Sequence, residues 1–138
     1  MQQSSEVFFA SSNEHKFEEA QRILSTLGVN IKLFKTTLEE IQSNSLNEIA
    51  KRKAIDAFTK IQKPILIEDD GLFINSLNGF PGPYSSYAYD TIGNTGIIQL
   101  LENTELRDAK FVAIIAYCNG VDEVKLFESS IPGKISKE

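Results

Sequence analysis

The sequence predicts an α/β protein with a mixed central β-sheet and flanking helices. Through the first half of the chain, short β-prone runs alternate with segments of helical periodicity. A long apolar run over residues 109–119 is followed by Asn119-Gly120 and by a second β-prone run over residues 124–130, which indicates a hairpin. Strands that alternate with helices and end in a hairpin are typical of a sheet with parallel and antiparallel neighbours.

Size and composition indicate one globular domain over residues 1–138. Apolar residues make up 41% and charged residues 24% of the chain, which is ordinary for a globular protein. The net charge of −5 argues against a sequence-independent grip on nucleic acid, although local basic groups can still bind a phosphate. Cys118 is the single cysteine, so no disulfide can form within the chain. Residues 1–11 lack the basic and apolar regions of a secretory leader. No stretch approaches the ~20 apolar residues of a membrane helix. These features predict a cytoplasmic protein that binds neither membrane nor nucleic acid.

The first strand is expected over residues 6–10, and it leads into Ser11 to Lys16, a turn rich in helix-capping residues. Ser11 with Glu14 fits a capping box, and Asn13 is the alternative cap. A helix should follow and end at Gly28. Its apolar positions recur at helical spacing and are Phe17, Ala20, Leu24 and Leu27.

A second strand is expected over residues 30–35. A second capping box, Ser45 with Glu48, opens a helix that runs to about residue 61. Lys53 falls at the edge of the apolar stripe of this helix. A lysine at such a position usually lays its aliphatic stem along the apolar surface and keeps its ammonium group in water. The functional alternative is that the ammonium group points toward an anion in a cleft. The stripe consists of Leu46, Ala50, Ala54, Ala57 and Ile61.

An acidic cluster follows the next short strand, residues 65–67. Glu68, Asp69 and Asp70 stand in a row, and Gly71 is expected to turn the chain away, so that the acids lie at the strand end. Carboxylates in such a place suit a hard divalent cation; the alternative is a solvated strand end before a turn.

Prolines and glycines over residues 79–83 predict a fixed, irregular loop. Three tyrosines cluster over residues 84–89, and a short helix is expected over residues 97–102. The run over residues 109–119 is apolar on both alternating sets, which predicts a strand buried on both faces. Cys118 is then a small buried hydrophobe in that strand.

These features together favour metal-assisted phosphoryl chemistry. The N-terminus of the first helix offers N–H groups to an anion, and Asn13 and Lys16 would add a donor and a charge; the alternative is a plain capped helix. An anion cradle, a carboxylate-bound cation and Lys53 are what a reacting phosphate needs. The chain has no nucleotide-binding Gly-rich fingerprint, too few His and Cys for a usual zinc site, and adjacent acids that do not suit a glycosidase.

Three motifs resemble those of a known family. They are the [ST]-x-N-x-x-K turn at Ser11 to Lys16, the E-x-A-x-x-K-A helix start at Glu48 to Ala54, and IEDDGLFINSLNGFPGPYS at Ile67 to Ser85. In order and over nearly the whole chain, the sequence resembles the inosine/xanthosine triphosphate pyrophosphatases, the Ham1 family, and most of all its archaeal members.

The resemblance implies Mg²⁺-dependent hydrolysis of ITP, XTP and dITP to a nucleoside monophosphate and pyrophosphate, which cleanses the nucleotide pool. It also implies a two-lobed fold with a cleft and a homodimer. Asp69 would be the general base, and Mg²⁺ would be bound by Glu48, Asp69 and Glu68. The substrate would be held by Ser11, Ser12, Asn13, Glu14, His15, Lys16, Lys53 and Asp70.

Two departures from the family pattern qualify these expectations. Asp70 stands where the family commonly has a serine that touches the substrate, and a third charge there repels phosphates unless a second cation neutralises it. The family's later G-F-G-Y-D-like and S-H-R segments are not among residues 1–138, so we expect a domain truncated at its C-terminus. The alternative functions are a nucleotide- or metal-binding module without turnover and a pyrophosphatase for other modified nucleotides.

Overall fold

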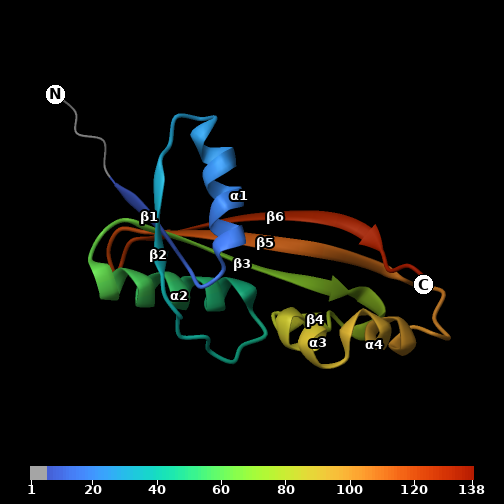
Figure 1. Cartoon of the computed structure of the whole chain (residues 1–138). Coiled ribbons are helices and arrows are strands. Elements are labelled where there is room, and N and C mark those ends of the chain that lie inside the picture. Colours follow the sequence, from blue (N-terminus) through green and yellow to red (C-terminus); the bar gives the residue numbers. More distant parts are fainter. Residues whose placement is uncertain (1–5) are drawn as a thin grey trace. The chain divides into compact units, whose positions relative to one another are not determined.

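The computed structural model describes residues 6–138 (Figure 1). Residues 1–5 lie outside the described residues. They belong to the N-terminal stretch in which no secretory leader is expected. The strands are β1 (Val7–Ser11), β2 (Ile31–Lys35), β3 (Ile65–Ile74), β4 (Pro81–Gly82), β5 (Asp108–Cys118) and β6 (Val124–Lys134). The helices are α1 (Glu14–Ser25), α2 (Leu46–Ile61), α3 (Ser85–Thr91) and α4 (Gly93–Leu100), with a 3₁₀ turn at Asn75–Leu77.

The sheet is mixed, as the sequence predicts. Its strand order is β2-β1-β3-β5-β6, with β4 paired to β3. Strand β1 is parallel to both β2 and β3, and β4 is antiparallel to β3. In the short turn between β5 and β6, the Asn119 N–H donates to the Glu123 carbonyl and the Glu123 N–H donates to the Gly120 carbonyl. A turn this short can join only antiparallel strands.

The chain divides into two compact units. Of the described residues, the first unit comprises residues 6–42, 47–68 and 115–127, and the second comprises residues 43–46, 69–114 and 128–138. The single-domain expectation stays a prediction. Among residues 6–138, no helix is long and apolar enough to cross a membrane.

The buried side of α2 is the one expected from its periodicity. Leu46, Ala50, Ala54 and Ala57 are buried, together with Ile49. Helix α1 is different, because it buries none of its residues fully, although the Phe17 ring lies 6.3 Å from the Phe9 ring. It also ends at Ser25, so that Leu27 lies beyond it and is 73% exposed.

The strand that carries the acids is longer than expected. Strand β3 does not end at residue 67 but continues through the acids to Ile74, and Gly71 does not turn the chain. A Cβ on Gly71 would overlap the Gly82 carbonyl, because β4 pairs there. Gly71 therefore permits a close strand approach rather than a turn, and the expectation of a strand end at the acids is wrong.

Other expectations need smaller corrections. Residues 85–91 form a helix, α3, where no helix or strand was expected, and α4 begins at Gly93 rather than at residue 97. Strand β5 is buried mainly on one face, because Val112, Ile114 and Ala116 are buried while Phe111 is 60% exposed. The second face of the strand is thus only partly covered by the described residues.

The irregular loop before α3 forms as the sequence predicts. Asn78, Gly79 and Gly82 all have positive φ, and the peptide bond between Phe80 and Pro81 is cis. Behind this loop, the second unit has its own core, made of Ile74, Ile97, Leu101 and Ala109 with Leu72, Leu77 and Ile135 packed against it.

Candidate functional site

The sheet brings the β1–α1 turn beside the start of the acidic cluster. Strands β1 and β3 are parallel, with Phe8 opposite Ile65 and Phe9 opposite Leu66. Continued along both strands, the same register places Ser11 opposite Glu68. Strand β1 ends at Ser11 while β3 continues past Glu68, so the turn that follows β1 lies beside the middle of β3.

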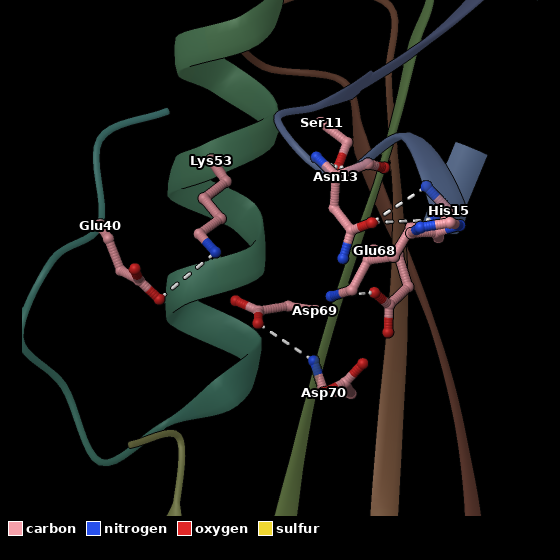
Figure 2. A network of polar contacts seen from close by, with 9 residues as sticks. Ser11, Asn13, His15, Glu40, Lys53, Glu68, Asp69 and Asp70 are labelled. Carbon is pink, nitrogen blue, oxygen red and sulfur yellow. Dashed lines mark hydrogen bonds and ion pairs between the residues drawn. The ribbon is translucent and has the colours of Figure 1, made fainter. Parts of the chain in front are cut away.

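Asn13 is the residue that caps α1. Its Oδ1 accepts hydrogen bonds from the backbone N–H groups of His15 at 3.0 Å and Lys16 at 3.3 Å (Figure 2). Ser11 does not form a capping box with Glu14; its Oγ accepts from the Asn13 N–H at 3.0 Å instead. The turn is thus fixed by its own side chains, and the alternative cap that the sequence offered is the correct one.

Lys16 extends from this turn to Glu68 on β3. The distance from Nζ to Oε2 is 2.7 Å, and the two side chains are 36% and 16% exposed. A pair this far withdrawn from water is less screened than a surface ion pair. The structure therefore brings together two predicted site residues that are distant in sequence.

The first turn of α1 also carries Glu14 and His15. Glu14 accepts a hydrogen bond from Lys35 at 3.0 Å, and this bond, together with the lysine charge, lowers the pKa of Glu14. His15 is almost fully exposed and lies 3.7 Å from Glu18. His15 is thus the solvated first-turn residue that its position indicates.

Lys53 lies on α2 beside the buried stripe, with a side chain only 17% exposed. Its Nζ lies 3.4 Å from Oε1 of Glu40, which is 60% exposed and belongs to the loop between β2 and α2 (Figure 2). Glu40 is the site neighbour that sequence reasoning missed. No periodicity or motif marks its loop, so no signal was available.

Alternation along β3 separates the three acids. Successive side chains of a strand point to opposite faces, so Glu68 and Asp70 share one face while Asp69 shares the other with Ile65 and Ile67. Asp69 is 8% exposed and Asp70 is exposed. The Asp70 N–H donates to Oδ1 of Asp69 at 3.0 Å. Asp69 is therefore buried and held by its neighbour's N–H, while Glu68 on the other face is held by Lys16.

The remaining predicted ligand, Glu48, lies exposed in the first turn of α2. Glu48 belongs to the first unit and Asp69 to the second. Within residues 6–138, no group of three His, Cys, Asp or Glu side chains forms a ready-made metal cage.

Known proteins resemble this chain over most of its length. The Ham1 family matches residues 7–138. A dITP/XTP pyrophosphatase of Methanopyrus kandleri is 43% identical over 132 residues, which cover 96% of this chain and 70% of the relative. One from Korarchaeum cryptofilum is 42% identical, covering 96% of this chain and 71% of the relative.

Solved structures agree with these sequence relatives. A HAM1 protein from Coxiella burnetii superposes with a TM-score of 0.82 at 26% identity, covering 98% of this chain and 75% of the other. The Ham1 protein of Staphylococcus aureus gives 0.79 at 28% identity, covering 96% and 72%. The α/β fold with a mixed sheet is thus shared with these proteins.

Proposed function

This chain belongs to the Ham1 family, and we propose that it hydrolyses non-canonical purine nucleoside triphosphates such as dITP and XTP to a monophosphate and pyrophosphate. The names of the relatives at 36–43% identity, dITP/XTP pyrophosphatase, support both the enzyme class and the substrate class. The class is that of a nucleoside triphosphate pyrophosphatase, a hydrolase.

The observation that carries the proposal is the fixed turn between β1 and α1. Asn13 caps the helix and accepts the backbone N–H of Lys16, whose ammonium group lies beside Glu68 of β3. A helix N-terminus with an adjacent lysine attracts phosphate through both N–H groups and charge. In the proposal, Ser11 to Lys16 and Lys53 hold the triphosphate.

Asp69 is assigned as the general base. Its carboxylate lies on the buried face of β3 and accepts the Asp70 N–H, which restricts its rotation. A carboxylate held in this way can orient a water molecule and take its proton as the water oxygen attacks phosphorus. The bond between the α and β phosphates then breaks, and pyrophosphate leaves with the electron pair of that bond.

The donor set fits Mg²⁺, the cation that the family resemblance implies. Glu48, Asp69 and Glu68 offer carboxylate oxygens, the ligands that a hard cation prefers. The absence of a three-residue cage among residues 6–138 is compatible with this, because Mg²⁺ usually takes one or two carboxylates and completes its shell with phosphate oxygens and water. When bound, Mg²⁺ would neutralise phosphate charge and lower the pKa of a coordinated water.

At the level of the cell, we propose a cytoplasmic enzyme that removes damaged nucleotides from the pool and that acts on free nucleotides rather than on nucleic acid. The net charge of −5 supports the proposal that the substrate is a free nucleotide, because binding to nucleic acid needs a basic face. A homodimer is proposed from the family resemblance.

Product analysis with Mg²⁺ and a panel of dITP, XTP, ATP and dUTP tests the proposal. We expect pyrophosphate and the monophosphate from dITP and XTP, with ATP largely spared. Release of inorganic phosphate instead would contradict the reaction. Preferential turnover of dUTP would favour a pyrophosphatase for other nucleotides.

Substitution at Asp69 tests the assigned base. Asp69→Asn should lower kcat by a factor of about 10²–10⁴ and leave dITP binding measurable, because only the proton acceptor is lost. Lys16→Ala is the matched comparison and should raise KM, since it removes a phosphate contact. Retained turnover in the Asp69 variant would show that another group is the base.

A further inference from the structure

A loop joins β2 to α2, and three side chains of α2 hold its first part. Each contact joins one residue of α2 to one residue of the loop. The contacts are Lys60 Nζ to the Thr37 carbonyl at 2.9 Å, the Glu39 N–H to Asp56 Oδ2 at 2.8 Å, and Lys53 Nζ to Glu40 Oε1 at 3.4 Å.

The three α2 residues, Lys53, Asp56 and Lys60, are spaced by three and four positions, so they lie along one face of the helix. Two of their contacts reach the loop backbone and therefore do not depend on the loop side chains. The third contact is different, because it is a charge pair between two side chains. Loss of the Glu40 carboxylate would thus leave the loop held at its other two contacts.

The two partners of this pair differ in their exposure to water. The Lys53 side chain is 17% exposed, while that of Glu40 is 60% exposed. A carboxylate so well solvated forms only a weak ion pair, because water and salt screen its attraction to the ammonium group. A polyphosphate carries more charge than one carboxylate and would compete for the same ammonium group.

We propose that Glu40 is an internal counter-ion of Lys53 that the phosphates of the substrate displace on binding. The inference rests on the proposed function, in which Lys53 holds the triphosphate. Glu40 thereby sets substrate affinity: it weakens binding of any anion at Lys53 and pairs with Lys53 again as the product leaves. It is a residue that determines affinity without touching the reacting atoms.

The test measures binding of inorganic tripolyphosphate to the full chain by calorimetry. Glu40→Gln should tighten binding by about two- to five-fold at low ionic strength, with a smaller effect in high salt. Glu39→Gln is the matched control, because it removes the same charge one residue away and keeps the Glu39 N–H bond to Asp56. With dITP, Glu40→Gln should lower KM and leave kcat unchanged.

Variants at Lys53 separate this inference from the proposed function. Lys53→Gln should weaken tripolyphosphate binding, and adding Glu40→Gln to it should then change binding no more than Glu39→Gln does. If Lys53→Gln leaves binding unchanged, Lys53 holds no phosphate and both proposals are wrong on this point. If Lys53→Gln weakens binding but Glu40→Gln behaves like Glu39→Gln, the counter-ion role is overturned and the proposed function stands.

Discussion

At the scale of single residues, charge pairing decides which groups of the candidate site are available for chemistry. Lys16 is held by Glu68 and Lys53 lies beside Glu40, so both proposed phosphate ligands are oriented before any substrate arrives. For Lys16 this preorganisation lowers the entropy cost of binding, whereas at Lys53 the Glu40 carboxylate competes with a phosphate for the ammonium group. Asp69, on the other face of β3, is the acid best placed for a separate role.

The pair between Glu14 and Lys35 gives a prediction about pH. The pKa of Glu14 is lowered from 4.5 by the hydrogen bond and the charge of Lys35. A lowered folded-state pKa contributes stability that is present above the unfolded-state pKa and is lost as pH falls through the folded-state pKa. Lys35→Gln should therefore be less stable than the parent above pH 4.5 and equal to it in stronger acid.

Urea unfolding across a pH series measures this difference. It should be small, because both side chains are well exposed. Lys51→Gln, which removes an exposed lysine of α2, serves as the control for lost charge alone. A difference between parent and Lys35→Gln that persists unchanged into acid would show that Glu14 is not the partner that matters.

At the scale of elements, the length of β3 is the feature with most consequence. The strand continues past the acids because Gly71 lets β4 approach closely. The acids consequently lie within a strand, where alternation fixes which face each one meets. A strand end at the same position would have left all three to rotate in a loop.

Gly71→Ala tests this explanation. The added methyl group would overlap the Gly82 carbonyl, so the free energy of unfolding should fall by about 1–3 kcal/mol. Gly133→Ala in β6 is the matched control, because a Cβ there meets no atom within 4 Å. Chemical denaturation of both variants gives the comparison, and equal stability of the two would refute the close approach.

At the scale of the whole molecule, Arg107 joins segments that lie far apart in the sequence. It is 7% exposed, and its guanidinium group donates to the carbonyls of Leu101 at 2.5 Å, Ile135 at 2.9 Å and Ser136 at 2.7 Å. The Ile135 N–H in turn donates to the Arg107 carbonyl. One side chain thus ties the end of α4 to the residues that follow β6.

Arg107→Lys should destabilise the protein although the charge is kept. A lysine cannot reproduce the planar fork, so the buried Leu101 carbonyl would lose its partner at a cost of about 1–3 kcal/mol. Thermal unfolding measures the loss, and faster amide exchange at Ile135 should accompany it. The exposed Arg22→Lys change should do neither; if the two variants behave alike, the fork contributes nothing.

The sequence by itself determined the features that depend on near neighbours. The polar residues before α1, the 3.6-residue stripe of α2 and the hairpin of β5 and β6 all follow from local spacing. The candidate phosphate turn and the three acids were found in the same way, because short motifs place them. Each of these features can be identified from residues that lie within about one turn or one strand of each other in the sequence.

Tertiary structure alone decided the rest. Nothing near Gly71 in the sequence shows that β4 will pair beside it, and nothing near Lys53 marks Glu40 as its neighbour. The partial burial of the second face of β5 and the bonds of the Arg107 fork likewise depend on which distant segments pack there. The spacing of residues along the chain determines the face of the helix or strand on which a side chain lies. The residue that it contacts depends on how distant elements pack together, and local spacing carries no information about that packing.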